Sequence, residues 1–299
     1  MRVAYVGLGA MGRPMAANLA ASFPTTVFNR TASVAHDHVA VHGGRAVEQL
    51  TDLADAEVVC SCLPTDVEVA AVARVLGPLL TPGTVWLDHT SGAPQGSRDT
   101  AAGLSAHGVD YLDAPVSGGT DGAARGALTV MVGGDAATLD RIRPVLGAVA
   151  ERVVHVGGVG AGMAVKAVNN VLLATSLRVA AEGLAALARL GIPAATALEV
   201  INASSGRSFA TERLVPERVL DRTFPFTFAL ELLAKDATLA EAVVADAGSQ
   251  APLLAAVAAL TREAAAELGP GADHVELVRV VEVAAGVQLG AEDEDRPTA

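Results

Sequence analysis

The chain has 299 residues, of which 51% are hydrophobic and 18% charged, and its formal net charge is −12. At about 100–200 residues per domain, this length predicts two domains whose cores need neither disulfides nor a structural metal. An acidic chain without a Lys/Arg-rich stretch argues against a nucleic-acid binder, although a locally positive site could take a small anion. Charged, polar or glycine residues interrupt every apolar run before the ~20 residues of a spanning helix, so we expect no membrane protein.

The two cysteines, Cys60 and Cys62, alternate inside an apolar run and are interpreted as small core residues. Two thiols make neither a disulfide framework nor a zinc site, so we expect no metal. The chain opens directly into a β-rich run, with no basic region followed by a long apolar segment. Together these features predict a cytoplasmic protein.

Short β-like runs alternate with helical segments through the first half of the chain. Strands are predicted at 3–6, 25–28, 57–62, 84–87, 109–112, 128–132 and 152–156, and helices at 13–21, 68–76, 96–106 and 136–148. Strands that alternate with helices form βαβ units and a largely parallel sheet. We therefore predict a Rossmann-type, doubly wound α/β domain over residues 1–158.

The pattern changes after residue 158, where only helical periodicity remains. An apolar stretch without proline predicts one long helix over 161–189, and further helices are predicted at 194–202, 228–247, 252–268 and 274–285. We predict an all-α substrate and dimerisation domain over 159–289, joined to the first domain by the long helix. The polar, acidic residues 290–299 are expected to be disordered.

The first motif is a GxGxxG made of Gly7, Leu8, Gly9, Ala10, Met11 and Gly12. It follows the first predicted strand and opens the first predicted helix. In this setting the first glycine permits a tight turn, the second lets a pyrophosphate approach the backbone, and the third allows close packing of helix on strand. The helix N-terminus adds free N–H groups and a positive dipole, which predicts dinucleotide binding.

The end of the second predicted strand bears on which dinucleotide binds. An acidic residue there would bind the ribose 2′-hydroxyl of NAD, but the chain has Asn29, Arg30 and Thr31. The Arg30 guanidinium can pair with a 2′-phosphate, with Asn29 and Thr31 adding hydrogen bonds. This pattern favours NADP and leaves NAD as the second choice.

A second glycine-containing segment follows the strand predicted at 109–112. Ser117, Gly118 and Gly119 can turn consecutive backbone N–H groups towards one anion, with the Ser117 hydroxyl as a further donor. A substrate carboxylate suits such a nest. A Ser-Gly-Gly sequence also occurs as an ordinary flexible turn.

Lys166 is one of only two lysines in the chain and lies in an Ala/Val/Met-rich stretch where the two predicted domains meet. Asn169 and Asn170 follow at the i+3 and i+4 positions, near the same helix face. A desolvated lysine can donate or accept a proton while amide groups orient a substrate oxygen, so we interpret Lys166 as the acid/base. A snorkelling lysine is the structural alternative, and His89 is the rival base.

Taken together, these motifs resemble the β-hydroxyacid dehydrogenase family, which includes 3-hydroxyisobutyrate dehydrogenase. The resemblance extends to about residue 286 and rests on four motifs in order: GLGAMGRPMAANL at 7–19, DAPVSGG at 113–119, GxxGxGxxxKxxNN at 157–170 and FxxxLxxKD at 228–236. It implies Lys166 as the catalytic acid/base. It also implies that Ser117, Gly118, Gly119 and Asn170 bind the substrate.

The same resemblance implies further cofactor contacts at Leu63, Pro64, Glu68, Ser91, Phe228 and Lys235. Family members usually have Asp-x-Ser-Thr where this chain has Asp88-His89-Thr90-Ser91, which retains both hydroxyls. The segment 204–208 is similar to the 3-hydroxyisobutyrate branch, whereas residues 29–31 are similar to NADP-using reductases. The expected substrate is therefore a small anionic 3-hydroxy acid or its semialdehyde.

Two other functions stay open on sequence grounds. An imine or ketimine reductase on the same scaffold usually replaces the catalytic lysine, so Lys166 argues against it. A non-catalytic dinucleotide sensor would keep the glycine loop, but the Lys166–Asn170 pair disfavours it. The apolar helix at 161–189 and the Ala-rich second half, together with the resemblance, predict a homodimer or homotetramer.

Overall fold

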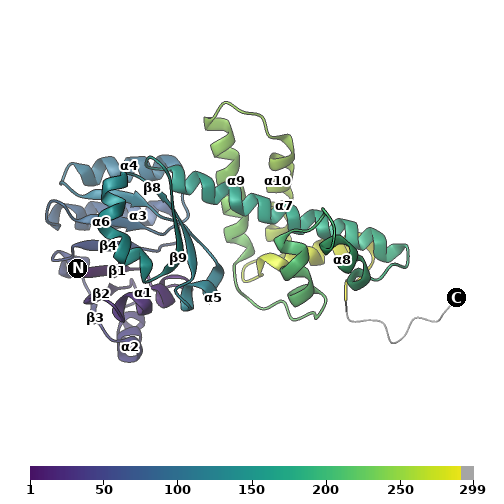
Figure 1. Cartoon of the computed structure of the whole chain (residues 1–299), viewed down its shortest axis with the longest axis horizontal. Coiled ribbons are helices and arrows are strands. Elements are labelled where there is room, and N and C mark those ends of the chain that lie inside the picture. The colour runs from purple at the N-terminus through teal and green to yellow at the C-terminus, as the bar shows by residue number, and fades with distance from the viewer. Residues whose placement is uncertain (291–299) are drawn as a thin grey trace. The chain divides into compact units, whose positions relative to one another are not determined.

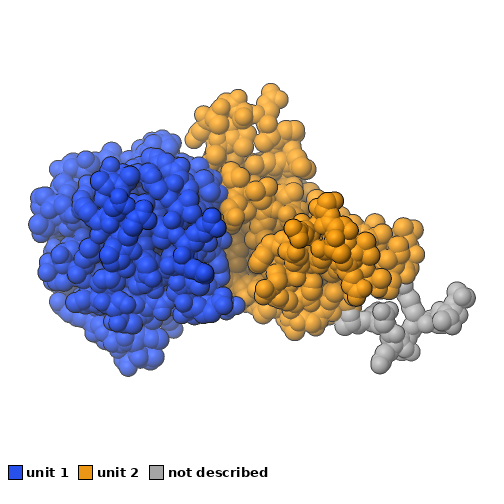
Figure 2. All heavy atoms as spheres, in the orientation of Figure 1, with its two compact units in different colours: residues 1–166 blue, residues 167–299 orange. Residues whose placement is uncertain are grey.

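A computed structural model describes residues 1–290 and divides the chain into two compact units, residues 1–166 and 167–299 (Figure 2). The division falls within helix α7 (Ala161–Arg189), directly after Lys166. Most of the acidic segment expected to be disordered, residues 291–299, lies outside the described residues.

Unit 1 is built on one sheet, whose strands among the described residues are β1 (Val3–Val6), β2 (Thr25–Phe28), β3 (Arg45–Val47), β4 (Val58–Ser61), β5 (Val85–Asp88), β6 (Asp110–Asp113), β7 (Val116–Ser117), β8 (Leu128–Gly133) and β9 (Ala150–Gly157). Their order is β3-β2-β1-β4-β5-β6-β8-β7, with β9 also paired to β8. The strands from β3 to β6 are parallel, whereas β8 runs antiparallel to β6 and β7. The predicted α/β class and largely parallel sheet are confirmed.

Helices cover both faces of this sheet (Figure 1). They are α1 (Gly12–Ala20), α2 (Ala32–His42), α3 (Asp66–Leu76), α4 (Pro94–Ser105), α5 (Gly119–Ala124) and α6 (Ala136–Gly147), with short 3₁₀ turns at Leu50–Leu53 and Gly77–Leu79. Alternate residues of β1 enter different cores: Tyr5 packs with residues of α1 and α6, and Val6 with residues of α3 and α4. Because β1, β4 and β5 are buried along their whole length, their sequences are largely apolar rather than alternating.

Two strands and two helices of unit 1 had no sequence prediction: β3, β7, α2 and α5. Strands β3 and β7 are only 3 and 2 residues long, too short to show a period. Helix α2 buries only Ala35 and His38, so it has no continuous apolar stripe. The strands β3 and β7 form through pairing with β2 and β8.

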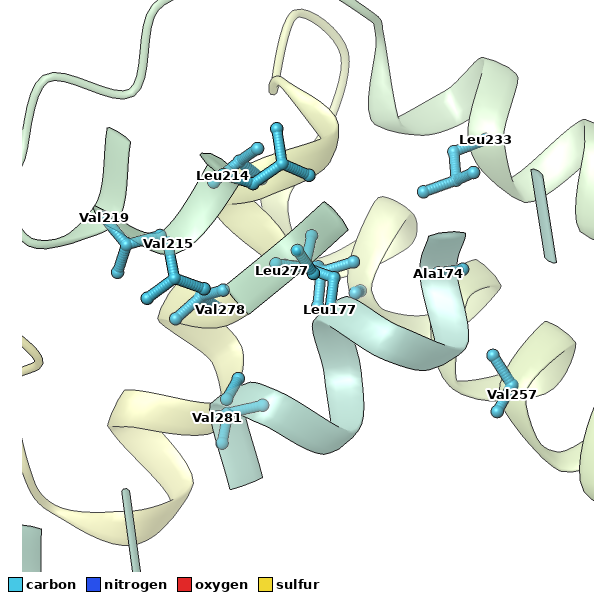
Figure 3. Close-up of a cluster of buried hydrophobic side chains, with 14 of the residues drawn as sticks. Ala174, Leu177, Leu214, Val215, Val219, Leu233, Val257, Leu277, Val278 and Val281 are labelled. Atoms are coloured by element: carbon cyan, nitrogen blue, oxygen red, sulfur yellow. The ribbon is translucent and has the colours of Figure 1, made fainter. Parts of the chain in front are cut away.

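Unit 2 is helical, as predicted. After α7 come α8 (Ala194–Asn202), a π-helical segment η3 (Ala210–Val219), α9 (Leu230–Asp246), α10 (Pro252–Leu268), a 3₁₀ turn (His274–Glu276) and α11 (Leu277–Ala285). Ala174 and Leu177 of α7 belong to one buried cluster with Leu214, Leu233 and Val278 (Figure 3). The predicted ranges of α7, α8 and α10 coincide with the observed ones.

Helix α7 is long and apolar enough, by length and composition alone, to cross a membrane. Its buried positions include Val171, Ala174, Leu177 and Leu184, all of which belong to the core of unit 2. A central helix of a packed unit passes the same test. We therefore interpret α7 as the core helix of unit 2.

Candidate cofactor and substrate site

The glycine loop between β1 and α1 has the geometry that a dinucleotide needs. Gly7 has a φ of +98°, and a Cβ there would lie 2.3 Å from the carbonyl oxygen of Cys62, while a Cβ at Gly12 would lie 2.0 Å from that of Gly7. A Cβ at Gly9 would meet nothing within 4 Å, so the middle of the loop is open. No side chain caps α1 and its first turn carries no acidic residue, so no side chain competes with a phosphate for the N–H groups at its start.

The side chain of Asn29, at the end of β2, makes hydrogen bonds to the backbone of the protein itself. Its Oδ1 accepts a hydrogen bond from the backbone N–H of Leu8 at 3.1 Å, and its Nδ2 donates to the carbonyl of Thr31 at 3.0 Å. The amide therefore ties the glycine loop to the end of the neighbouring strand. The Leu8 N–H is occupied by this bond.

Arg30 and Thr31 are exposed beside this loop, where the ribose of a dinucleotide binds in such folds. The Arg30 charge acts on Glu68 of α3 and, after the stronger effect of the Thr65 hydroxyl, helps hold the pKa of that carboxyl below its ordinary value. The Thr65 hydroxyl donates to Glu68 and accepts from the Val67 N–H, which caps α3. Two predicted cofactor residues, Arg30 and Glu68, are thus electrostatic neighbours.

Leu63, Pro64 and Ser91 follow the adjacent parallel strands β4 and β5, so they lie at the same sheet edge as the glycine loop. The backbone N–H of Leu63 donates to Thr90 Oγ1 at 3.0 Å, which links the two loops directly. Ligands of doubly wound sheets bind outside the carboxyl ends of the strands. The predicted cofactor residues of unit 1 are therefore gathered on the side where a dinucleotide would bind.

The predicted nest spans the junction of β7 and α5: Ser117 ends the strand, Gly118 caps the helix and Gly119 begins it. Gly118 and Gly119 have φ values of +134° and +64°, and nothing lies within 4 Å of a Cβ built at Gly119. Side chains other than glycine rarely adopt such angles, so the two glycines are required for this turn. Ser117 is partly buried and both glycines are exposed, as an anion-binding loop requires.

Lys166 is partly buried near the start of α7. That start is held in place by Asp113, for which the sequence predicted no role. The Asp113 carboxylate, fully buried at the end of β6, accepts from the backbone N–H groups of Gly160 at 2.7 Å and Met163 at 3.0 Å. A Cβ at Gly162 would lie 2.8 Å from the same carboxylate. Burial raises the pKa of Asp113 while the backbone donors oppose that rise.

In unit 2, Asn170 is buried and its amide is fixed. Its Nδ2 donates to Asp236 Oδ2 at 2.6 Å, and its Oδ1 accepts from Asn169 Nδ2 at 3.1 Å. Asp236 also pairs with Lys235, with 3.5 Å between Nζ and Oδ1. The structure thus brings Asn170 and Lys235 to one carboxylate.

Phe228 and His89 are less suited to direct roles. Phe228 packs against the core of unit 2, and its ring centroid lies 5.6 Å from that of His274. His89 is buried, its Nδ1 lies 2.8 Å from the carbonyl oxygen of Ala114, and burial lowers its pKa to about 4. A histidine that stays neutral at ordinary pH is a poor proton donor, which weighs against His89 as the rival acid/base.

Asp113 and Asp236 are the residues that sequence reasoning missed. Each stands inside a motif that was singled out for other residues, Asp113 before the Ser-Gly-Gly turn and Asp236 after Lys235. A carboxylate in such a motif indicates a buried hydrogen-bond acceptor. Its donor, however, is distant in sequence: Met163 lies 50 residues from Asp113, and Asn170 lies 66 residues from Asp236. The motif alone could not identify them.

Family models match both halves of the chain. Residues 2–157 match the NAD binding domain of 6-phosphogluconate dehydrogenase, and residues 160–281 match the family described as NAD-binding of NADP-dependent 3-hydroxyisobutyrate dehydrogenase. The 2-(hydroxymethyl)glutarate dehydrogenase of Eubacterium barkeri is 37% identical over 80% of this chain and 81% of its own. The NAD-dependent L-serine dehydrogenase of Pseudomonas aeruginosa is 36% identical over 84% of this chain and 88% of its own.

Among solved structures, the 3-hydroxyisobutyrate dehydrogenase of Mycobacterium tuberculosis with L-serine has a TM-score of 0.88 and is 33% identical. The alignment covers 94% of this chain and 98% of that one. The similarity therefore extends over both units.

Proposed function

The chain belongs to the 3-hydroxyisobutyrate dehydrogenase-like family of β-hydroxyacid dehydrogenases, and we propose that it interconverts a small 3-hydroxy acid and its semialdehyde with NADP. As a member of this family it is an NAD(P)-dependent oxidoreductase that acts on CH–OH groups, which confirms the expected enzyme class. This leaves no reason to keep the non-catalytic sensor. The substrate within the class and the preference for NADP are the proposal.

A bound dinucleotide supplies or accepts the hydride. The open glycine loop and the uncapped start of α1 would hold its pyrophosphate, and Arg30 its 2′-phosphate. In oxidation, neutral Lys166 takes the proton of the substrate hydroxyl, and in reduction the Lys166 ammonium returns it to the carbonyl oxygen. The backbone N–H groups at Ser117–Gly119 hold the substrate carboxylate, and Asn170 orients the reacting oxygen.

The observation that carries this proposal is the placement of Lys166. It lies in the first two turns of α7, whose start is held by the buried Asp113 carboxylate, and Asn170 follows one turn later with its amide fixed by Asp236. A lysine that served only to cover apolar surface would need neither the fixed helix start nor the fixed amide.

The test is a spectrophotometric screen of NAD and NADP with 3-hydroxyisobutyrate, serine, glycerate, 4-hydroxybutyrate and their carbonyl counterparts. We expect the highest kcat/KM with NADP and a branched or unbranched 3-hydroxy acid. Lys166→Met should lower kcat about 10²–10⁴-fold while dinucleotide still binds. His89→Asn, which keeps a donor for the Ala114 carbonyl, is the control for the rival base. Normal turnover in the Lys166 variant would refute the assignment.

The alternative is an imine reductase on the same scaffold, a class whose solved structures share this fold. Lys166 distinguishes the two, because reduction of an imine does not require a base that deprotonates a hydroxyl. Turnover of cyclic imines without turnover of hydroxy acids would favour the alternative.

A homodimer or homotetramer is proposed from α7. Opposite its buried face, Val168, Leu172 and Val179 recur at helical spacing and are 36%, 60% and 57% exposed. Exposed large apolar side chains in one row mark a contact surface, and a second copy of this chain is the proposed partner. Light scattering of the wild type and of Leu172→Glu tests this, with dissociation expected only for the variant. The cytoplasmic location stays a prediction.

A further inference from the structure

Three polar residues stand side by side at the carboxyl ends of neighbouring strands in unit 1. Ser61 of β4 is in register with Asp88 of β5, and Asp88 is in register with Asp113 of β6. All three are at most 1% exposed. A buried carboxylate is costly unless donors surround it, so each member of this row must be satisfied by nearby groups.

Asp88 at the centre of the row is held by donors from three elements. Its Oδ1 accepts from the Ser61 hydroxyl at 2.9 Å and from the Thr90 backbone N–H at 3.1 Å, and its Oδ2 accepts from the Tyr111 hydroxyl at 2.9 Å. The Ser61 oxygen in turn accepts from the indole N–H of Trp86 at 3.0 Å. The carboxylate therefore fixes the loop after β5 against both neighbouring strands.

Thr90 extends this network to the loop after β4. Its backbone N–H donates to Asp88, and its Oγ1 accepts from the Leu63 N–H at 3.0 Å. Thr90 thus fixes the loop after β5 through its backbone N–H, which bonds to the Asp88 carboxylate. It fixes the loop after β4 through its hydroxyl, which bonds to the Leu63 N–H. Both loops lie at the sheet edge where dinucleotides bind in such folds.

We propose that Asp88 and Thr90 are positioning residues that hold the loops carrying Leu63 and Ser91 in the conformation that binds the dinucleotide. Neither side chain needs to touch the cofactor, because both act through the backbone that follows β4 and β5. This inference rests on the proposed cofactor contacts of Leu63 and Ser91. It is independent of the substrate and of Lys166.

The test compares Thr90→Val, Thr90→Ser and Thr84→Val in the full-length chain. Valine keeps the shape of threonine but removes the acceptor of the Leu63 N–H, whereas serine keeps that acceptor. Thr84, just before β5, is the matched control: it is 4% exposed and its hydroxyl donates to the Ala56 carbonyl at 3.2 Å, at the opposite end of the same strand.

Dissociation constants for NADP and NAD are measured by isothermal titration calorimetry, and KM and kcat by steady-state kinetics. We expect Thr90→Val to weaken dinucleotide binding about tenfold, because the loops are correctly placed for a smaller fraction of the time. The KM for the dinucleotide should rise with it while kcat at saturation stays close to the wild type. Thr90→Ser should restore binding, and Thr84→Val should lower the melting temperature without changing binding.

Equal affinity of Thr90→Val and wild type would overturn the inference, as would equal losses in Thr90→Val and Thr90→Ser. Ser91→Ala shows whether a negative result concerns the positioning role of Thr90 or the proposed contact of Ser91 with the dinucleotide. Unchanged affinity in Ser91→Ala refutes the contact itself, whereas weaker binding in Ser91→Ala beside normal binding in Thr90→Val refutes only the positioning role. The fluorescence of Trp86, the single tryptophan of the chain, reports whether the row stays intact in each variant.

Discussion

The carboxylate of Asp113 accepts a hydrogen bond from the backbone N–H of Met163 at 3.0 Å, so the last residue of β6 holds the first turn of the helix that carries Lys166. The same strand leads, four residues later, to the turn that begins at Ser117. The end of β6 therefore lies next in sequence to the proposed carboxylate nest, and its Asp113 side chain holds the helix start that carries the proposed base. Within unit 1 this is the direct connection between the second and third sequence motifs.

Asp113→Asn should damage both stability and turnover. Both carboxylate oxygens accept from backbone N–H groups, of Gly160 and Met163, and an amide can offer only one acceptor. The other N–H then loses its partner, which lowers the free energy of unfolding by about 1–3 kcal/mol. Displacement of the first turn of α7 should lower kcat, by as much as ~100-fold.

Asp135→Asn is the matched control for that experiment. Asp135 also caps a helix, with its Oδ2 accepting from the Thr138 N–H at 2.7 Å, but α6 carries no residue of the proposed site. Urea denaturation and steady-state kinetics should show at most a small loss of stability and normal kcat. If both variants lost activity equally, Asp113 would have no special link to Lys166.

Asp88→Asn should have the opposite effect on stability at neutral pH. Burial raises the pKa of Asp88 from 3.8 to about 6, so between these values the folded state binds the proton that the unfolded state has released. The stabilising effect of that proton is complete below the unfolded value and is lost as the pH rises through about 6. The difference corresponds to about 3 kcal/mol, which the neutral amide avoids.

The geometry of Asp88 allows this substitution. The amide oxygen can take the place of Oδ1, and its NH₂ can donate to Tyr111, whose hydroxyl proton turns to Ser97 at 3.4 Å. Melting temperatures measured from about pH 4 to pH 8 should show the variant more stable at the upper end and equal to wild type at the lower end. A constant difference across this range would show that the ionisation of Asp88 does not control stability.

Arg30→Ala should reverse the proposed cofactor preference. Losing a charge-assisted hydrogen bond to the 2′-phosphate should weaken NADP binding about 10–100-fold and leave NAD binding nearly unchanged. Calorimetric titration with both dinucleotides measures this. Arg143→Ala removes another exposed arginine, in α6, and should affect neither. A wild-type preference for NAD would contradict the assignment of Arg30.

Asp236→Ala should lower kcat/KM for the hydroxy acid by about tenfold or more, because the amide of Asn170 loses the acceptor that fixes it. Asp236→Asn retains an oxygen that can accept from Asn170 and should recover part of the activity. Kinetics at saturating dinucleotide measure the two variants. If both variants lost the same amount of kcat/KM, the loss would come from the broken ion pair of Asp236 with Lys235, at 3.5 Å, rather than from Asn170.

Much of the fold was predictable from local patterns. The ranges of α7, α8 and α10 were predicted to the residue, because their apolar stretches end at a glycine, a proline or a polar turn. The strand β1 and the glycine loop after it were equally clear, because Gly7 and Gly12 are required by backbone contacts that no other residue allows. The strands β3 and β7 were missed because residues distant in sequence, not their own pattern, stabilise them.

The candidate site was predictable only where a residue type carries its chemistry by itself. Lys166 stood out because the chain has two lysines, and Arg30 because a carboxylate was absent where NAD would need one. Asn29 was predicted as a nucleotide contact, and its amide also holds the glycine loop through Leu8. That second use follows from the pairing of β1 with β2 and could not be seen in either segment alone.

The sequence alone determined most of this protein's strands and helices and its glycine loop, because these depend on neighbours within a few positions. It also singled out Lys166, the one lysine in the first 234 residues. Tertiary structure decided which carboxylates are buried and what they hold. Ser61 bonds to Asp88 across 27 residues of sequence, Met163 to Asp113 across 50, and Asn170 to Asp236 across 66. Only strand register and helix packing bring these pairs within hydrogen-bonding distance.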